Sequence, residues 1–195
     1  MTIEFKPVLP DFEHIKRYHD RQRNMVVAKI LPGEFYVTKQ EEAISTVLGS
    51  CISACIWDDK MGIGGMNHFM LPTKGDAFGS EGWQNNNSYT CRYGLWAMEY
   101  LINEILKYGG YRNNLKVKLF GGGRVLQNMT SDVGAQNIQF AEEYILNEEL
   151  PIVGSDVGGS WPRKVLFFPA TGKALVKKLH TTHNDTIQRR EIQYR

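Results

Sequence analysis

The chain has 195 residues, of which 42% are hydrophobic and 23% are charged, and its formal net charge is +2. This ordinary globular composition excludes wholesale disorder, collagen and repeat arrays, and the length fits one domain with tails. A nearly balanced charge provides no general attraction to nucleic acid or to an anionic membrane. Any specificity must therefore come from a local site.

Three cysteines, Cys51, Cys55 and Cys91, are too few and too odd in number for a disulfide framework. Nothing near Met1 resembles a signal peptide, and no apolar run approaches the roughly 18 residues of a membrane helix. We therefore expect a cytoplasmic protein with reduced thiols and no membrane insertion. Its cysteines must be explained by packing, metal binding or chemistry.

Both ends of the chain are polar. Between residues 13 and 24 the sequence is mostly charged, with only two apolar anchors. We interpret residues 1–27 as a basic extension, either a solvated arm or a short surface helix, and residues 181–195 as a polar tail. The predicted domain is residues 28–180.

Short apolar runs separated by glycine, proline and aspartate predict strands in the first part of the domain. The predicted strands are 25–31, 35–38, 43–48, 52–57 and 62–71. A long polar loop follows at 73–90, and loops of that length in compact domains often serve as lids or partner surfaces.

Two helices and four further strands are predicted after this loop. Apolar residues at spacings of three and four from Leu95 to Leu106 predict the first helix, and Gly109–Gly110 ends it. The remaining predictions are a helix at 134–148 and strands at 115–120, 152–157, 164–168 and 174–177. Many strands with two main helices favour an α/β fold, a layered α/β sandwich with a mixed sheet or sheets.

The densest candidate site lies between Ser45 and Pro72. Cys51 directly follows Gly49–Ser50 and begins an apolar strand, so its thiol lies at a strand end, next to backbone N–H groups that can hold an oxyanion. His68 is the one histidine outside the polar ends, and two short strands joined by a turn would bring it beside Cys51. These residue types in this order predict a cysteine nucleophile paired with a histidine base.

Other interpretations of the same residues compete with this one. Cys51 and His68 fit a purely structural role, since free cysteines and lone histidines are commonly buried for packing. A zinc site is disfavoured because Cys51 and Cys55 lie roughly 13 Å apart along a strand and chelating spacing is absent. The glycine-rich stretches at 62–67 and 121–126 lack the signatures of nucleotide-binding loops. We therefore expect neither a metal nor a cofactor.

Six motifs occur in order along the predicted domain. They are Leu48–Cys51, Gly62–Pro72, Lys118–Gly122, Asn137–Ile138, Pro151–Gly159 and Arg163–Gly172. Together they resemble the CheD family of chemoreceptor glutamine deamidases, over roughly residues 28–180. The resemblance implies a fold similar to the catalytic domain of the cytotoxic necrotizing factor toxins.

The resemblance also implies an activity, the conversion of glutamine side chains of methyl-accepting chemotaxis receptors to glutamate, with release of ammonia through a cysteine thioester. Cys51 and His68 match the cysteine and histidine of the family. The hydroxyl residue of the family lies six residues before the cysteine, which is Ser45 here, with Thr46 as the alternative if the register is shifted.

Further residues are expected to support this activity. Backbone N–H groups at Gly49 and Ser50 would hold the oxyanion, and Asn67, Gly121 and Gly122 would line the substrate rim. The aromatic residues Phe78, Trp83 and Tyr89 of the 73–90 loop either extend this rim or pack locally. The resemblance allows a CheC-like phosphatase as a second partner. The alternative function is a non-catalytic adaptor that binds a receptor or a phosphatase through an idle pocket.

Overall fold

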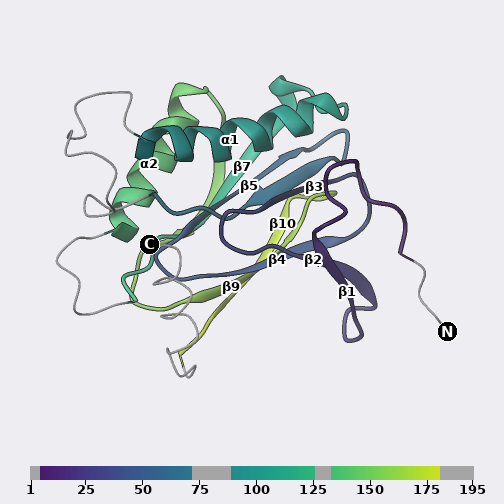
Figure 1. Cartoon of the computed structure of the whole chain (residues 1–195), viewed down its shortest axis with the longest axis horizontal. Helices are drawn as coiled ribbons and strands as arrows, with labels where there is room; N and C mark the ends of the chain where they lie inside the picture. Colours follow the sequence, from purple (N-terminus) through teal and green to yellow (C-terminus); the bar gives the residue numbers. More distant parts are fainter. Residues whose placement is uncertain (1–4, 72–88, 126–132, 181–195) are drawn as a thin grey trace.

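The computed structural model describes residues 5–71, 89–125 and 133–180. In this part of the chain, two five-stranded sheets and two helices pack together (Figure 1). The first sheet has the order β1 (Lys16–Asp20), β2 (Met25–Lys29), β4 (Ala43–Leu48), β9 (Arg163–Phe168), β10 (Lys173–Lys178). The second has the order β3 (Phe35–Thr38), β6 (Gly64–Asn67), β5 (Ile52–Asp58), β7 (Leu115–Gly121), β8 (Ile152–Val157). The helices are α1 (Tyr89–Lys107), α2 (Val133–Asn147) and a 3-10 turn, η1 (Arg112–Asn114).

Both sheets are mixed. The pairs β2–β4 and β7–β8 are parallel, and the other neighbouring strands are antiparallel. The predicted layered α/β fold with mixed sheets and two main helices is therefore confirmed. No helix among the described residues is long and apolar enough to cross a membrane.

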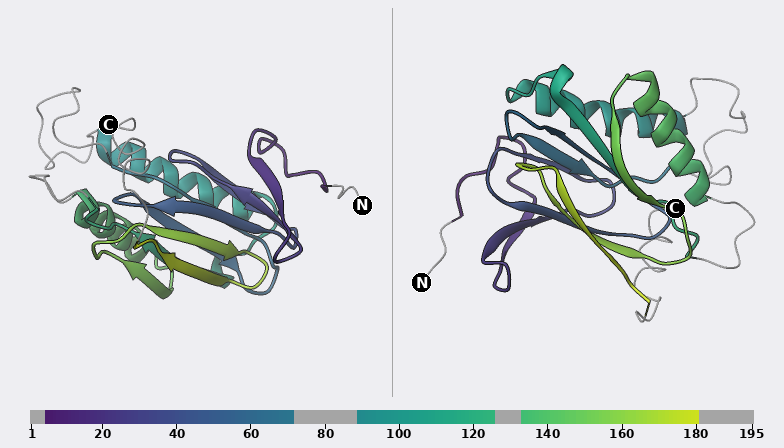
Figure 2. Two further views of the ribbon diagram at one scale, coloured as in Figure 1. Left: turned by 90° about the horizontal axis from the view of Figure 1, so that it is seen from below. Right: turned by 180° about the vertical axis from the view of Figure 1, so that it is seen from behind.

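The helices, the second sheet and the first sheet form three layers, with the second sheet in the middle. Both helices cover one of its faces, α1 over β3, β5 and β6 and α2 over β5 and β7, and the first sheet lies against the other (Figures 1 and 2). The sequence of β5 explains its central place, since every residue from Ile52 to Asp58 is buried. Because side chains alternate along a strand, Ile52 and Ala54 face the helices, while Trp57 contacts Phe167 of the first sheet.

The periodic apolar face of α1 packs onto the second sheet, as its spacing predicts. Met98, Leu101 and Ile105 are fully buried on that face. The helix ends at Lys107, Gly109 just beyond it adopts φ 103°, and the Gly110 N–H donates to the Ile105 carbonyl. This is the left-handed glycine cap expected after the last apolar turn.

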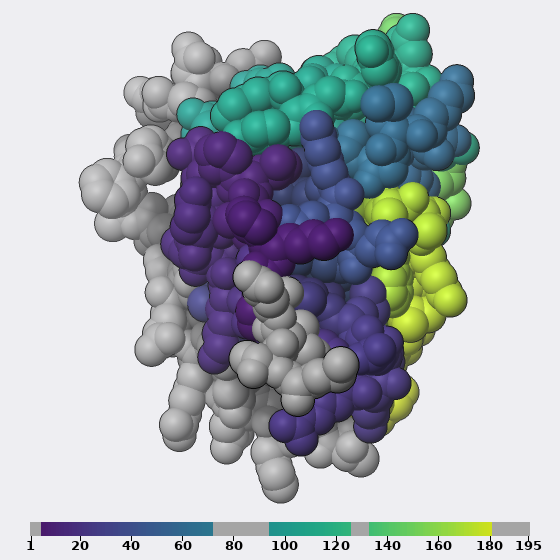
Figure 3. All heavy atoms as spheres, turned by 90° about the vertical axis from the view of Figure 1, so that its right-hand side faces the viewer, coloured from purple at the N-terminus to yellow at the C-terminus, as the bar shows by residue number. Residues whose placement is uncertain are grey.

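The prediction that residues 1–27 form an extension, as a solvated arm or a short surface helix, is wrong for the described part of this range. Strand β1 pairs with β2 as an edge hairpin, and the preceding Phe12 and Ile15 are buried in the main core. Figure 3 shows this N-terminal segment, in purple, lying against α1. The polar side chains misled the prediction because an edge strand needs only its backbone to pair, while its outer face stays in water. The predicted tail at 181–195 and residues 73–88 of the predicted loop lie outside the described residues.

Candidate active site

Two backbone hydrogen bonds bring the candidate cysteine beside the candidate histidine. The Ile52 N–H donates to the Phe69 carbonyl at 2.9 Å, and the Phe69 N–H donates to the Ile52 carbonyl at 3.0 Å. In such an antiparallel pair, Cys51 and His68 are diagonal neighbours on the same face, typically about 7–8 Å apart between Cα atoms. That face is turned toward the first sheet, so both side chains lie buried between the two sheets.

Thr46 of β4 reaches this space from the opposite sheet. Its Oγ1 lies 2.8 Å from His68 Nδ1 and 2.9 Å from the Ile30 carbonyl oxygen. A hydroxyl has a single proton, and a carbonyl can only accept, so Thr46 donates to Ile30 and accepts from His68. The geometry therefore places the ring proton of His68 on Nδ1.

The other ring nitrogen of His68 is left with a lone pair. Among the described residues, Nε2 of His68 is buried and has no hydrogen-bond partner. Burial lowers the pKa of His68 to about 3, because the charged imidazolium would lose its hydration. At neutral pH the ring is thus an uncharged base whose accepting atom is Nε2.

The structure corrects the assignment of the hydroxyl residue. Side chains alternate across a strand, so Ser45 and Thr46 point to opposite faces of the first sheet. Ala43, two residues before Ser45, packs with Val27 and Leu166 in a separate small cluster on the outer face. Ser45 therefore cannot fix the imidazole, and Thr46, the predicted alternative, takes that place.

The loop before β5 is held by three hydrogen bonds to its carbonyls. Gly49 O accepts from the Gly123 N–H at 2.8 Å, Ser50 O from Asn137 Nδ2 at 2.8 Å, and Cys51 O from the Gly122 N–H at 2.7 Å. In a planar trans peptide, each N–H points opposite to the preceding carbonyl. The N–H of Ser50 therefore points away from Gly123 and that of Cys51 away from Asn137, and both N–H groups stay predicted oxyanion donors.

The glycines predicted at the substrate rim instead support this loop. Gly121 and Gly122 are buried, with φ of 112° and 65°. A Cβ on Gly121 would overlap the Cys51 carbonyl oxygen, and one on Gly122 would overlap Ile138. Only glycine allows the backbone to pass this close to the cysteine loop.

The prediction that Asn67 lines the substrate rim is also wrong. It faces the helices, since its Oδ1 accepts from the Ala54 N–H at 2.8 Å and its Nδ2 donates to the Ala97 carbonyl at 3.0 Å. This fully buried amide joins β6 to β5 and to α1, and it lies on the face opposite His68. The rest of the predicted rim, including Phe78, Trp83 and the side chain of Tyr89, lies outside the described residues.

Sequence reasoning missed the role of Asn137. Its Nδ2 donates to Ser50 O and its Oδ1 accepts from the Leu71 N–H, both at 2.8 Å. One buried amide thus joins the loop before Cys51 to the segment after His68. The available signal was a polar residue on the inner face of a helix, four residues before the buried Ala141.

The second cysteine has a different environment. Cys55 is completely buried, and burial raises the pKa of its thiol well above the usual range, so it is a packing residue. The side chain of Cys91 lies outside the described residues. Within the described ranges, no group of three or more His, Cys, Asp or Glu side chains could hold a metal ion.

Comparison with known proteins identifies similar chains. A family model described as CheD chemotactic sensory transduction matches residues 70–178. The chain is 54% identical over 187 residues to the probable chemoreceptor glutamine deamidase CheD of Halorhodospira halophila, covering 95% of this chain and 85% of the relative. It is 51% identical over 192 residues to the protein of that name from Saccharophagus degradans (97% and 87%). A third relative, the probable chemoreceptor glutamine deamidase CheD 1 of Dechloromonas aromatica, is 50% identical over 186 residues (94% and 89%).

Proposed function

The chain belongs to the CheD family, and from this premise we propose that it is a chemoreceptor glutamine deamidase that uses Cys51 as its nucleophile. Its substrates would be glutamine side chains of methyl-accepting chemotaxis receptors. One observation carries the proposal: beside Cys51, a buried and neutral His68 has its Nδ1 proton held by Thr46 and its Nε2 without a partner among the described residues.

In the first step, the glutamine amide is attacked. Nε2 of His68 takes the proton of the Cys51 thiol while the sulfur forms a bond to the glutamine Cδ, and the C=O electron pair moves onto oxygen. Amides of the 49–51 loop would donate to this oxyanion, and one such donor typically contributes about 3 kcal/mol. Because burial keeps the imidazole neutral, proton transfer accompanies the attack and does not precede it.

In the second step, the imidazolium gives its proton to the amide nitrogen, the C–N bond breaks, and ammonia leaves a thioester on Cys51. Water then enters, and His68 takes one of its protons as its oxygen attacks the thioester carbon. The C–S bond breaks, the sulfur recovers the proton, and glutamate is released. The Thr46 oxygen accepts the hydrogen bond from Nδ1–H throughout, which keeps the proton on Nδ1 and Nε2 available for each transfer.

Thr46 supplies no negative charge, unlike the carboxylate of an Asp-containing triad. The imidazolium formed at each step is therefore less stabilised, and we expect a modest turnover number.

A CheC-like phosphatase stays a predicted partner.

The test is deamidation of the purified cytoplasmic region of a cognate receptor. Mass spectrometry should find selected glutamine-containing peptides heavier by one mass unit, the difference between NH2 and OH, with ammonia released in equal amount. Cys51→Ala should abolish both signals, and Cys55→Ala is the matched control because that buried thiol lies outside the site. Tight receptor binding without any mass change would instead favour the non-catalytic adaptor.

A further inference from the structure

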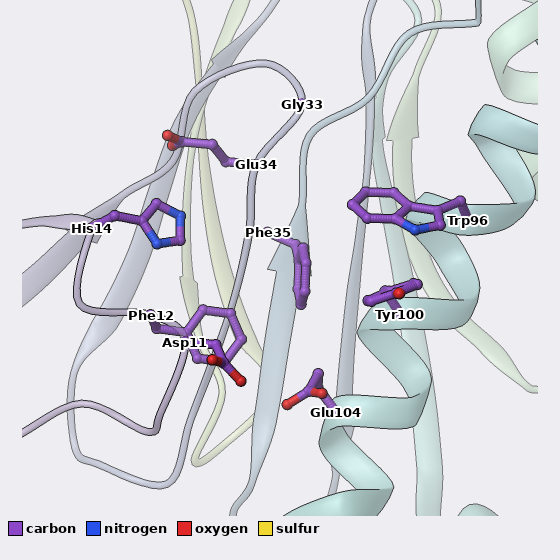
Figure 4. A pocket seen from close by; sticks show the side chains of 9 residues that line it. All are labelled: Asp11, Phe12, His14, Gly33, Glu34, Phe35, Trp96, Tyr100 and Glu104. Carbon is purple, nitrogen blue, oxygen red and sulfur yellow. The ribbon is translucent and has the colours of Figure 1, made fainter.

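A pocket separate from the candidate active site opens at the surface between the N-terminal segment and α1. The pocket has a volume of about 340 Å³ and contains none of Cys51, His68 or Thr46. Trp96, Tyr100 and Glu104 lie on successive turns of α1 and face Phe35 of β3, while the segment 11–14 closes the other side (Figure 4). This volume is suited to one long side chain or a small ligand.

The wall on the helix side is aromatic and half exposed. The Trp96 and Tyr100 rings have centroids 4.4 Å apart, and each ring lies about 6 Å from Phe35, at 6.4 Å and 6.3 Å. Trp96 and Tyr100 keep 42% and 46% of their surface exposed. Exposed aromatic faces of this kind attract cations and stack well with a planar guanidinium.

The remaining wall is acidic. Asp11, Glu34 and Glu104 line the pocket together with His14. The nearby cation is Lys107, whose Nζ lies 3.0 Å from Glu104 and 3.8 Å from Asp11. Counting His14 as neutral, the described residues around the pocket carry an excess of two negative charges, on a chain whose net charge is +2. Local charge therefore selects a cationic occupant and opposes an anionic one.

The turn at Gly33 and Glu34 lines the pocket and is hydrogen-bonded to the backbone of the candidate histidine. The Gly33 N–H donates to the His68 carbonyl at 2.7 Å, and the His68 N–H donates to the Glu34 carbonyl at 2.9 Å. Gly33 and Glu34 line the pocket, so the backbone of this part of its wall lies about one strand spacing from the backbone of His68. A protein segment that brings a glutamine to Cys51 can thus place a neighbouring side chain in the pocket.

We propose that this pocket binds an arginine side chain of the receptor substrate and so positions the receptor helix for deamidation. The inference rests on the proposed function for the identity of the partner. Arginine fits better than lysine because its flat guanidinium can stack on Trp96 and Tyr100 while its N–H fork reaches a carboxylate at the rim. Lysine would offer a point charge to the same carboxylates but no stacking.

Binding is tested first with a small probe and the intact protein. The four tryptophans give four indole N–H signals in a 15N-resolved spectrum, and Trp96→Phe identifies the one from the pocket. N-acetylargininamide should shift that signal saturably in the millimolar range, and the citrulline analogue, its neutral counterpart, should bind at least about tenfold more weakly. No saturable shift of this signal, or equal binding of the citrulline or lysine analogue, would overturn the proposal.

The second test measures receptor deamidation. Glu34→Gln and Trp96→Ala should each raise KM for the receptor, together by about tenfold or more, and should raise KM more than they lower kcat. Glu99→Gln is the matched control, since it removes one exposed carboxylate of α1, the helix that carries Trp96, at a position outside the pocket. An unchanged KM in both pocket variants would refute the role in docking. If the chain had no deamidase activity, the probe titration would still report arginine binding, so the two failures can be told apart.

Discussion

Thr46 determines which nitrogen of His68 carries the proton. Its own proton goes to the Ile30 carbonyl at 2.9 Å, so its oxygen can only accept from Nδ1. Without that acceptor, a neutral imidazole could also carry its proton on Nε2, the atom that must receive the thiol proton. The proposed chemistry thus depends on a hydroxyl group that acts through the imidazole of His68.

Removing this hydroxyl should slow the reaction without removing the nucleophile. We expect Thr46→Val to lower kcat roughly 10- to 100-fold, since a buried N–H left without its acceptor costs about 1–3 kcal/mol. Thr46→Ser should restore most of the rate, because it keeps the oxygen. Ser45→Ala, one residue away on the outer face, should leave kcat at the wild-type value. A large loss in Ser45→Ala with a normal Thr46→Val would contradict the assignment.

Burial of His68 should make stability depend on pH. Its pKa is about 3 in the folded protein and about 6.5 in the unfolded chain, so the unfolded state binds more protons between these values. Stability is fully present above pH 6.5 and is lost as the pH falls toward 3. Between pH 7 and pH 5 the loss due to His68 is about 2 kcal/mol.

Urea denaturation of wild type and His68→Gln at both pH values measures this contribution. The loss of unfolding free energy between pH 7 and pH 5 should be about 2 kcal/mol smaller in His68→Gln. The same change at the exposed His180 serves as the matched control. Identical losses in wild type and His68→Gln would show that the folded protein protonates His68 readily.

At the scale of elements, two neighbouring structures hold the cysteine loop. In the turn after β7, the N–H groups of Gly122 and Gly123 donate to the carbonyls of Cys51 and Gly49. Nδ2 of Asn137 in α2 donates to the Ser50 carbonyl, which lies between them in the chain. Since Asn137 also accepts from the Leu71 N–H, α2 fixes the spacing between the loop and the segment after β6 that carries His68. Rigid support from a strand turn and a helix is what a positioned nucleophile requires.

Asn137 is therefore expected to act as a positioning residue. Asn137→Asp keeps the acceptor for Leu71 but turns a second oxygen toward the Ser50 carbonyl, so we expect kcat to fall at least about tenfold with little change in KM. Gln139→Ala, on the exposed side of the same helix, is the control. The readout is the split between kcat and KM. A loss of stability with an unchanged kcat in the folded fraction would mean that Asn137 serves packing alone.

At the scale of the molecule, the candidate active site depends on the packing of two sheets. Cys51 directly precedes β5 and His68 directly follows β6 of the second sheet, while Thr46 lies in β4 of the first, so the three residues come together only when the sheets pack on each other. The N-terminal segment contributes to this closure, because the buried Phe12 packs edge-on against Phe35 and Tyr36 of β3 at 5.3 Å. A segment with the composition of a tail is thus part of the core.

Truncating Phe12 tests this part of the core. Phe12→Ala should reduce the free energy of unfolding by about 3–5 kcal/mol, because it removes a buried ring that the neighbouring side chains cannot replace. Phe5→Ala is the control: that ring is 40% exposed and contacts Arg17, so the loss should stay below about 1 kcal/mol. Urea denaturation gives both values, and equal small losses would support the solvated arm predicted from composition.

The amino-acid sequence by itself determined the local features of this protein. Apolar runs bounded by turn residues defined strands such as β4 and β8 to the residue, and the periodic face of α1 defined that helix, because both signals depend only on neighbours along the chain. The sequence also singled out Cys51 and His68 and the family resemblance. The tertiary structure alone decided that Thr46 and not Ser45 contacts the imidazole. It also decided that Asn67 and the glycines at 121–122 pack as buried supports of the site, and that Asn137 joins the loop before Cys51 to the segment after His68. Those outcomes depend on which face of a strand turns toward a sheet or helix far away in the sequence, and one residue of register reverses that face.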